Sequence, residues 1–125
     1  MRIVDANVVL RYVLSDHEVL SAKARQIIDF NTVEVPIEVL CEVVFVLSKV
    51  YKVDRKDIGQ QISGFFEKTS SILSHREAVL KGLELFAENN LDFVDCLLAG
   101  YMCMEGAVVD TFDDKLQKLI GRFKQ

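Results

Sequence analysis

Short β-type runs alternate with longer helical patterns along the chain, and this alternation constrains the fold more than any other feature. Apolar runs of strand type occupy residues 2–4, 33–35, 71–73 and 107–109. Helical patterns occupy residues 7–14, 21–30, 36–51, 55–68, 74–87, 92–105 and 113–120. Strands separated by helical crossovers predict a parallel sheet with helices on both faces. We therefore expect an α/β fold, and because no linker divides the sequence we expect one domain over residues 1–125.

Residues with known preferences for helix ends mark where several helices begin and stop. Asp54 is a suitable N-cap for the helix over residues 55–68. Ser74 and Glu77 have the spacing of a capping box for the next helix. Gly106 is expected to end the helix over residues 92–105. These signals are local, so they predict helix boundaries without tertiary information.

The overall composition is that of an acidic globular protein. Half of the 125 residues are apolar and 27% are charged, which excludes a disordered chain. The net charge of −4 provides no overall attraction to nucleic acid, so a phosphate-bearing partner needs a local binding site. The apolar runs are too short to span a membrane, and no signal-peptide pattern is recognisable. Three cysteines without metal-ligand spacing predict buried, reduced thiols in a cytoplasmic protein.

Several acidic residues fall where an α/β sheet binds its ligands, beyond the carboxyl ends of the strands. Asp5 ends the first apolar run, and Asp113 follows the last one. Asp95 lies in the first turn of the helix that Asp92 opens, and Glu42 lies within the most apolar helix. Each acid taken singly has an ordinary alternative. The aspartates could be helix caps, and Glu42 could belong to a narrow solvent-facing stripe.

Several carboxylates at one edge of a sheet predict a cation-binding site. Unpaired carboxylates repel one another and raise each other's pKa, and a hard cation among them removes the repulsion. Mg²⁺ prefers oxygen ligands and retains several waters, and Mn²⁺ is bound by the same ligands. The Cys and His residues lack metal-ligand spacing, so a zinc site is not expected. A divalent cation held in this way supports phosphodiester hydrolysis, because it neutralises the phosphate and activates a water molecule.

Four segments of the chain together resemble the PIN-domain family, and within it the short VapC-like toxins of bacteria and archaea. They are Val-Asp-Ala-Asn-Val-Val-Leu at 4–10, the apolar stretch 39–47 around Glu42, Leu-Asp-Phe-Val-Asp-Cys-Leu-Leu-Ala at 91–99, and Val-Asp-Thr-Phe-Asp at 109–113. The segments occur in the family's order and spacing, and the resemblance covers essentially the whole chain. It implies a three-layer α/β/α sandwich with a short parallel sheet.

The resemblance also implies a set of site residues. The residues that match the family's metal-binding and catalytic acids are Asp5, Glu42, Asp95 and Asp113. The residues that match supporting positions are Asn7, Thr111 and Asp92. Because Asp114 directly follows Asp113, the sequence leaves open which of these two carboxylates faces the metal.

The activity that the resemblance implies is Mg²⁺-dependent endoribonuclease cleavage of phosphodiester bonds in single-stranded RNA, with Mn²⁺ able to substitute. The protein would be the toxin of a toxin–antitoxin pair and a cytoplasmic homodimer. A small antitoxin would neutralise it by placing its C-terminal segment in the active-site groove. Cations that could guide the RNA backbone are Arg11, Lys49, Lys52, Arg55 and Lys115.

Other functional classes fit the same residues less well. A phosphoacceptor receiver domain needs an acceptor aspartate after a central strand, whereas Asp54 follows a helical stretch and Lys115 begins a helix. A haloacid-dehalogenase-type phosphatase needs Asp-x-Asp near the start, whereas Asn7 occupies the second position. A catalytically idle PIN-like interaction module is the remaining alternative, and the presence of all four acids argues against it.

Overall fold

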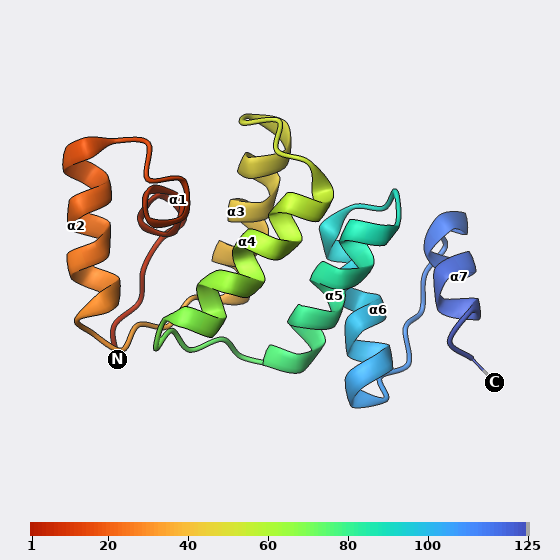
Figure 1. Ribbon diagram of the computed structural model, residues 1–125. Helices are drawn as coiled ribbons and strands as arrows, with labels where there is room; N and C mark the ends of the chain where they lie inside the picture. Colours follow the sequence, from red (N-terminus) through yellow and green to blue (C-terminus); the bar gives the residue numbers. More distant parts are fainter. Residues whose placement is uncertain (125) are drawn as a thin grey trace. The chain divides into compact units, whose positions relative to one another are not determined.

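The protein's structure, a computed structural model, describes residues 1–124 and contains seven helices within them (Figure 1). The chain is divided into two compact units after residue 74. We call them the N-terminal unit (Met1–Ser74) and the C-terminal unit (His75–Gln125). The helices of the N-terminal unit are α1 (Ala6–Leu14), α2 (Glu18–Asp29), α3 (Ile37–Lys49) and α4 (Arg55–Lys68). The helices of the C-terminal unit are α5 (Arg76–Glu88), α6 (Phe93–Glu105) and α7 (Asp114–Gly121). All seven predicted helices are therefore confirmed, while the expectation of a single domain stays a prediction.

The prediction of a parallel sheet is wrong, because residues 1–124 form no strand. Within these residues, β-type pairing is limited to two isolated parallel bridges, which join Ile3 to Glu34 and Glu34 to Ile72. The run at 107–109 forms no bridge in the described part of the chain, and Val108 is 85% exposed there. The expected three-layer α/β/α sandwich is thus replaced by an all-helical architecture with three bridged, extended connections in the N-terminal unit.

The extended runs of the N-terminal unit pair in parallel, but each is too short to form a ladder. The N–H of Glu34 donates to the carbonyl of Arg2 (2.7 Å), and the N–H of Val35 donates to the carbonyl of Ile72 (2.9 Å). Strands in globular proteins average about 5–6 residues, whereas these apolar runs extend over about three. Their apolar pattern reflects side-chain burial, since Val33 and Val35 are fully buried. A buried extended connection shows the same pattern as a short strand, so the pattern does not distinguish them.

Helix ends follow the local signals at most, but not all, of the predicted positions. The side chain of Asp54 accepts a backbone N–H and begins α4 as predicted. Gly106 ends α6 in the left-handed conformation, with φ at +69°. The prediction that Ser74 and Glu77 form a capping box is wrong. His75 is instead the N-cap residue of α5, at φ 52°, and it forms no side-chain capping bond.

Tyr12 connects three helices of the N-terminal unit. Its hydroxyl on α1 donates to Asp29 Oδ1 at the end of α2 (2.6 Å). Its ring meets the ring of Phe65 on α4 edge to face, with centroids 5.3 Å apart. Lys68 Nζ lies 5.4 Å from the centre of the same ring. Burial and the bond to Asp29 raise the pKa of Tyr12 to about 12.

This arrangement predicts a loss of stability in alkaline solution. The phenol is neutral when protonated, and its pKa is higher in the folded chain than the value of about 10 in an unfolded one. Its contribution is therefore fully present below pH 10 and is lost as the pH rises towards 12. Tyr12→Phe should lower the free energy of unfolding by about 1 kcal/mol at neutral pH and flatten this alkaline decline. Denaturant unfolding at several pH values measures both effects, and an unchanged alkaline decline in the variant would contradict the assignment.

The backbones of α5 and α6 approach each other closely at two glycines in the C-terminal unit. A Cβ on Gly100 of α6 would overlap the carbonyl oxygen of Ala78 and lie 3.0 Å from the amide nitrogen of Gly82, both on α5. A Cβ on Gly82 would in turn lie 3.0 Å from Leu97 Cα. Glycine at these positions permits the close approach of the two helices.

The remaining predictions from composition concern the thiols and the membrane. Cys96 is buried as expected, whereas Cys41 and Cys103 are only partly buried, and all three are free thiols. Burial, with a smaller effect of the nearby Glu38 charge, raises the pKa of the Cys41 thiol. None of the helices within residues 1–124 combines the length and apolar character that crossing a membrane requires.

Candidate functional site

Three of the predicted site acids lie at the beginnings of α6 and α7 in the C-terminal unit. Asp92 is the N-cap residue of α6, and Asp95 lies in the first turn of that helix. Asp113 is the N-cap residue of α7, which packs against α6. Asp95 lies close enough to Asp92 and Asp113 for both charges to act on it. We call these three residues the acid cluster.

Asp95 is the electrostatically strained member of the acid cluster. Its partial burial raises its pKa, and the negative charges of Asp113 and Asp92 raise it further. None of the salt bridges within residues 1–124 involves Asp95. Asp92 forms no side-chain capping bond, so the alternative that its side chain caps this helix is wrong. The Asp92 carboxylate is therefore not engaged in capping α6, although Asp92 is the N-cap residue of this helix.

Asp113, rather than Asp114, is the carboxylate whose charge acts on Asp95. Its Oδ1 accepts a backbone N–H of α7 (2.8 Å), which agrees with its predicted role as a cap. Its own N–H donates to Thr111 Oγ1 (3.0 Å), so the threonine hydroxyl positions the Asp113 backbone. Gln117 Nε2 donates to the Thr111 carbonyl (2.7 Å) and ties that segment to α7. The sequence analysis missed Gln117, because a glutamine within a short helix carries no recognisable signal.

The other predicted residues belong to the N-terminal unit. Asp5 is the N-cap residue of α1, where its Oδ1 accepts the N–H of Val8 (3.2 Å). Asn7 lies in the first turn of α1 and is exposed. Glu42 is exposed on α3, whose other side is buried, as the solvent-stripe alternative predicted. These side chains are therefore accessible, and one oxygen of Asp5 is engaged in capping.

The acid cluster agrees in chemical kind with a divalent cation site. Its donors are all carboxylate oxygens, and the raised pKa of Asp95 indicates repulsion that a cation would relieve. Within residues 1–124, no three His, Cys, Asp or Glu side chains are grouped so that they could hold a metal ion. Mg²⁺ does not require such a group, because it is commonly bound by one or two carboxylates together with waters and substrate phosphates. The cluster therefore offers ligands of the kind that a divalent cation prefers, but the described residues do not form a complete metal site by themselves.

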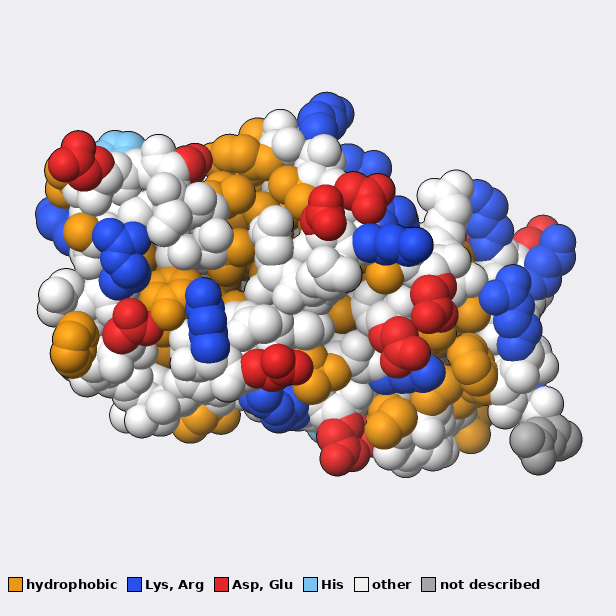
Figure 2. Space-filling view, in the orientation of Figure 1, with side chains coloured by type: hydrophobic (Ala, Val, Ile, Leu, Met, Phe, Trp, Pro, Cys, Tyr) orange, Lys and Arg blue, Asp and Glu red, His pale blue; other side chains and the backbone are white. Residues whose placement is uncertain are grey.

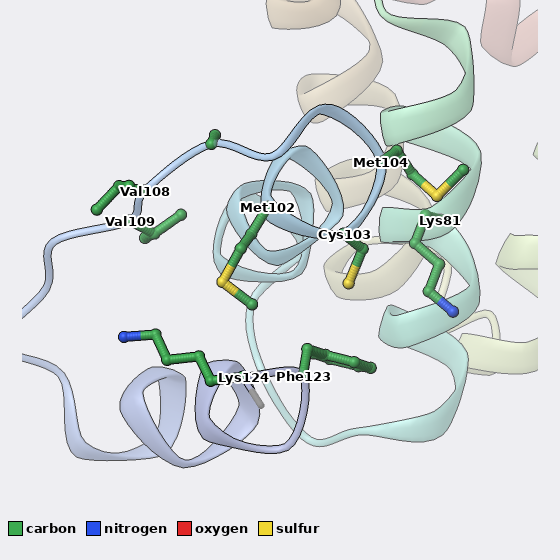
Figure 3. A pocket seen from close by; sticks show the side chains of 9 residues that line it. Lys81, Met102, Cys103, Met104, Val108, Val109, Phe123 and Lys124 are labelled. Atoms are coloured by element: carbon green, nitrogen blue, oxygen red, sulfur yellow. The ribbon is translucent and has the colours of Figure 1, made fainter.

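A separate apolar hollow of about 580 Å³ lies elsewhere in the C-terminal unit. Figure 3 shows Met102 and Cys103 of α6 facing Phe123 and Lys124, which follow α7. The remaining residues that line it are Lys81, Met104, Ala107, Val108 and Val109. Because none of these described residues is acidic, this hollow lacks the groups that phosphodiester hydrolysis requires.

Comparison with known proteins identifies the family of the chain. The chain matches no curated protein and no solved structure significantly. The family model described as PIN domain matches residues 2–121. PIN domains are typically nucleases that use divalent metal ions and act on RNA, so a nuclease-type enzyme is supported here. Because the match extends over nearly the whole sequence, the chain belongs to the PIN domain family.

Proposed function

We propose that this protein is a Mg²⁺-dependent endoribonuclease that hydrolyses phosphodiester bonds of single-stranded RNA. The observation that carries the proposal is the acid cluster, in which Asp95 lies beside two like charges and forms none of the salt bridges found among residues 1–124. Such an arrangement lowers stability, and costs of this kind are characteristic of functional sites. The family match supplies the reaction class.

In this proposal the four acids that match the family's site, Asp5, Glu42, Asp95 and Asp113, are required for hydrolysis. Asp95 and Asp113 hold the cation directly or through water, with Asp92 as an additional acid. When bound, the cation neutralises the phosphate and lowers the pKa of a water molecule. Asp5 is proposed as a further metal-binding acid. Glu42 is exposed and accepts a proton from the attacking water.

The supporting polar residues act through hydrogen bonds. Thr111 accepts the N–H of Asp113 and thereby fixes the carboxylate that it precedes. Asn7, exposed in the first turn of α1, is available to bind a phosphate oxygen. Both residues are therefore positioning residues in this scheme.

We further place the protein in the cytoplasm as the toxin of a toxin–antitoxin pair, acting as a homodimer. The free thiols are compatible with a reducing compartment. A small open reading frame adjoining the gene, whose product binds the protein and stops cleavage, is the expected sign of the antitoxin. Sedimentation of the purified protein tests the dimer.

The direct test measures cleavage of end-labelled single-stranded RNA with Mg²⁺, with Mn²⁺ and with EDTA. Asp5→Asn is expected to lower the cleavage rate by at least about 100-fold. The fold should persist, because asparagine is as good an N-cap as aspartate and retains the bond to Val8. Asp57→Asn, an exposed acid in the first turn of α4, is the matched control and should leave the rate unchanged.

Three results would argue against the proposal. Cleavage that persists in EDTA would exclude the metal, and full activity of Asp5→Asn would remove that acid from the site. A wild-type protein that folds but cleaves no RNA, and whose thermal midpoint does not respond to Mn²⁺, would instead be the catalytically idle interaction module.

A further inference from the structure

The basic side chains of the C-terminal unit gather on α7 and the residues after it. Four of the six Lys and Arg residues of this unit lie in the segment 115–124, although acidic residues outnumber basic ones in the unit as a whole. Figure 2 shows these charges as a group of Lys and Arg side chains over α7. An acidic unit therefore carries one strongly basic surface.

Three of these cations lie on one face of α7 and its end. Lys115, Lys118 and Arg122 are spaced by three and four residues, which places them on the same side of a helix. Leu116 and Ile120 are buried on the other side. At about 1.5 Å rise per residue, the three cations extend over about 10 Å, the length of about three stacked nucleotides. Within residues 1–124, none of the salt bridges involves any of the three.

The same cations line a groove of about 300 Å³ together with two asparagines. The other residues that line it are Asn89, Asn90, Leu91 and Leu119. Arg122 Nη1 donates to Asn89 Oδ1 (3.1 Å), while Asn89 Nδ2 donates to the Leu85 carbonyl (2.9 Å). Asn89 is thus held by bonds on both sides, so the polar wall of the groove is ordered. A guanidinium has five N–H donors, and the bond to Asn89 uses one of them.

Two residues that line the groove are close in sequence to members of the acid cluster. Leu91, which lines the groove, immediately precedes Asp92. Lys115, at the other wall, follows Asp113 by two residues. Residues that line the groove therefore lie within two positions of Asp92 and Asp113 in the sequence.

We infer that Lys115, Lys118 and Arg122, with Asn89 and Asn90, bind the sugar-phosphate backbone of the single-stranded RNA substrate next to its cleavage site. This inference rests on the proposed function, and it assigns one surface of the enzyme to its substrate. Ammonium and guanidinium groups bind phosphates, and the amides can bond to ribose hydroxyls or base edges. The described residues that line the groove are three cations, two asparagines and two leucines, and none is acidic, so the groove suits a polyanion. The two amides favour RNA over an acidic peptide, because RNA offers them ribose hydroxyls and base edges.

The test measures binding without cleavage. A fluorescein-labelled oligouridylate is titrated in EDTA at a series of KCl concentrations, and anisotropy gives the binding constant. Each phosphate contact to a single strand contributes about −0.7 to the slope of log K against log salt. Lys118→Gln should make the slope shallower by about 0.7, and Lys115→Gln with Lys118→Gln by about 1.4. Lys118→Arg keeps the charge and should keep the slope, and Lys23→Gln on α2 is the exposed-lysine control.

The outcomes separate this inference from the proposed function. If wild-type protein cleaves RNA but the double variant keeps the full salt slope, the groove does not bind the substrate and the inference is wrong. If the double variant loses binding to poly-glutamate and not to RNA, the groove is a site for acidic peptides and the inference is also wrong. If the slope falls as expected but wild-type protein cleaves nothing, the RNA surface stands and the proposed nuclease activity fails. Thermal unfolding of each variant verifies that it is folded.

Discussion

Replacing Asp95 with asparagine is expected to abolish RNA cleavage and, at the same time, to stabilise the protein. Asp95 is partly buried beside Asp113 and Asp92, and its pKa is raised for these reasons. A raised pKa means that the folded chain binds the proton more tightly than the unfolded chain does. The ionised carboxylate therefore lowers stability at neutral pH, and stability is regained as the pH falls through its folded-state pKa.

The asparagine side chain is neutral and of nearly the same shape, so it removes the repulsion without leaving a cavity. We expect the free energy of unfolding to rise by about 0.5 kcal/mol and the cleavage rate to fall by at least about 100-fold. Mn²⁺ should raise the thermal midpoint of wild-type protein more than that of the variant, because the cluster has lost one ligand.

Asp110→Asn is the matched control for this experiment. Asp110 is exposed and lies three residues before Asp113, outside the acid cluster. Its replacement should change neither the cleavage rate nor the response to Mn²⁺. If Asp95→Asn cleaves RNA normally, or if it unfolds more readily than wild-type protein, then Asp95 has a structural role and the assignment of the cluster is wrong.

Replacing Gly100 with alanine is expected to produce the largest loss of stability. The added Cβ would overlap the carbonyl oxygen of Ala78, a backbone atom that cannot rotate away. The helices α5 and α6 must then separate, which disrupts the packing along both of them. We expect the free energy of unfolding to fall by about 3 kcal/mol and the thermal midpoint by about 10 °C.

A second glycine provides the control, because it has the opposite environment. Gly64 lies inside α4, and a Cβ built there meets nothing within 4 Å. Gly64→Ala should therefore raise the free energy of unfolding by about 0.5–1 kcal/mol, through the better helix propensity of alanine. Calorimetry of the two variants measures both effects. Equal changes at the two positions would show that the close approach of α5 and α6 does not limit the packing of the C-terminal unit.

The helices could be predicted because their signals are local. The N-cap at Asp54 and the stop at Gly106 depend on the backbone within one turn of each residue, and both are present. The capping box at Ser74 had an equally good local pattern, yet His75 begins α5 instead. Such a pattern indicates that a helix begins nearby, while neighbouring packing selects the residue at which it begins.

The candidate site was predictable in part for a similar reason. Asp113 precedes a helix, and the cap that it forms is a local structure. Its effect on Asp95, eighteen residues earlier in the sequence, depends on the packing of α7 against α6. Sequence alone therefore could not choose between Asp113 and Asp114. The spacing of Lys115, Lys118 and Arg122 was visible in the sequence, but the groove that they form with Asn89 was not.

The sequence by itself determined the family, the seven helices and the candidate acids, because each of these depends on residue identity and short-range order. Only the tertiary structure decided that the short apolar runs form isolated bridges and no sheet, that Asp95 is electrostatically strained, and that Gly100 permits a close helix pair. These features are contacts between residues distant in sequence. Their free energies depend on distance and burial, which residue order does not specify.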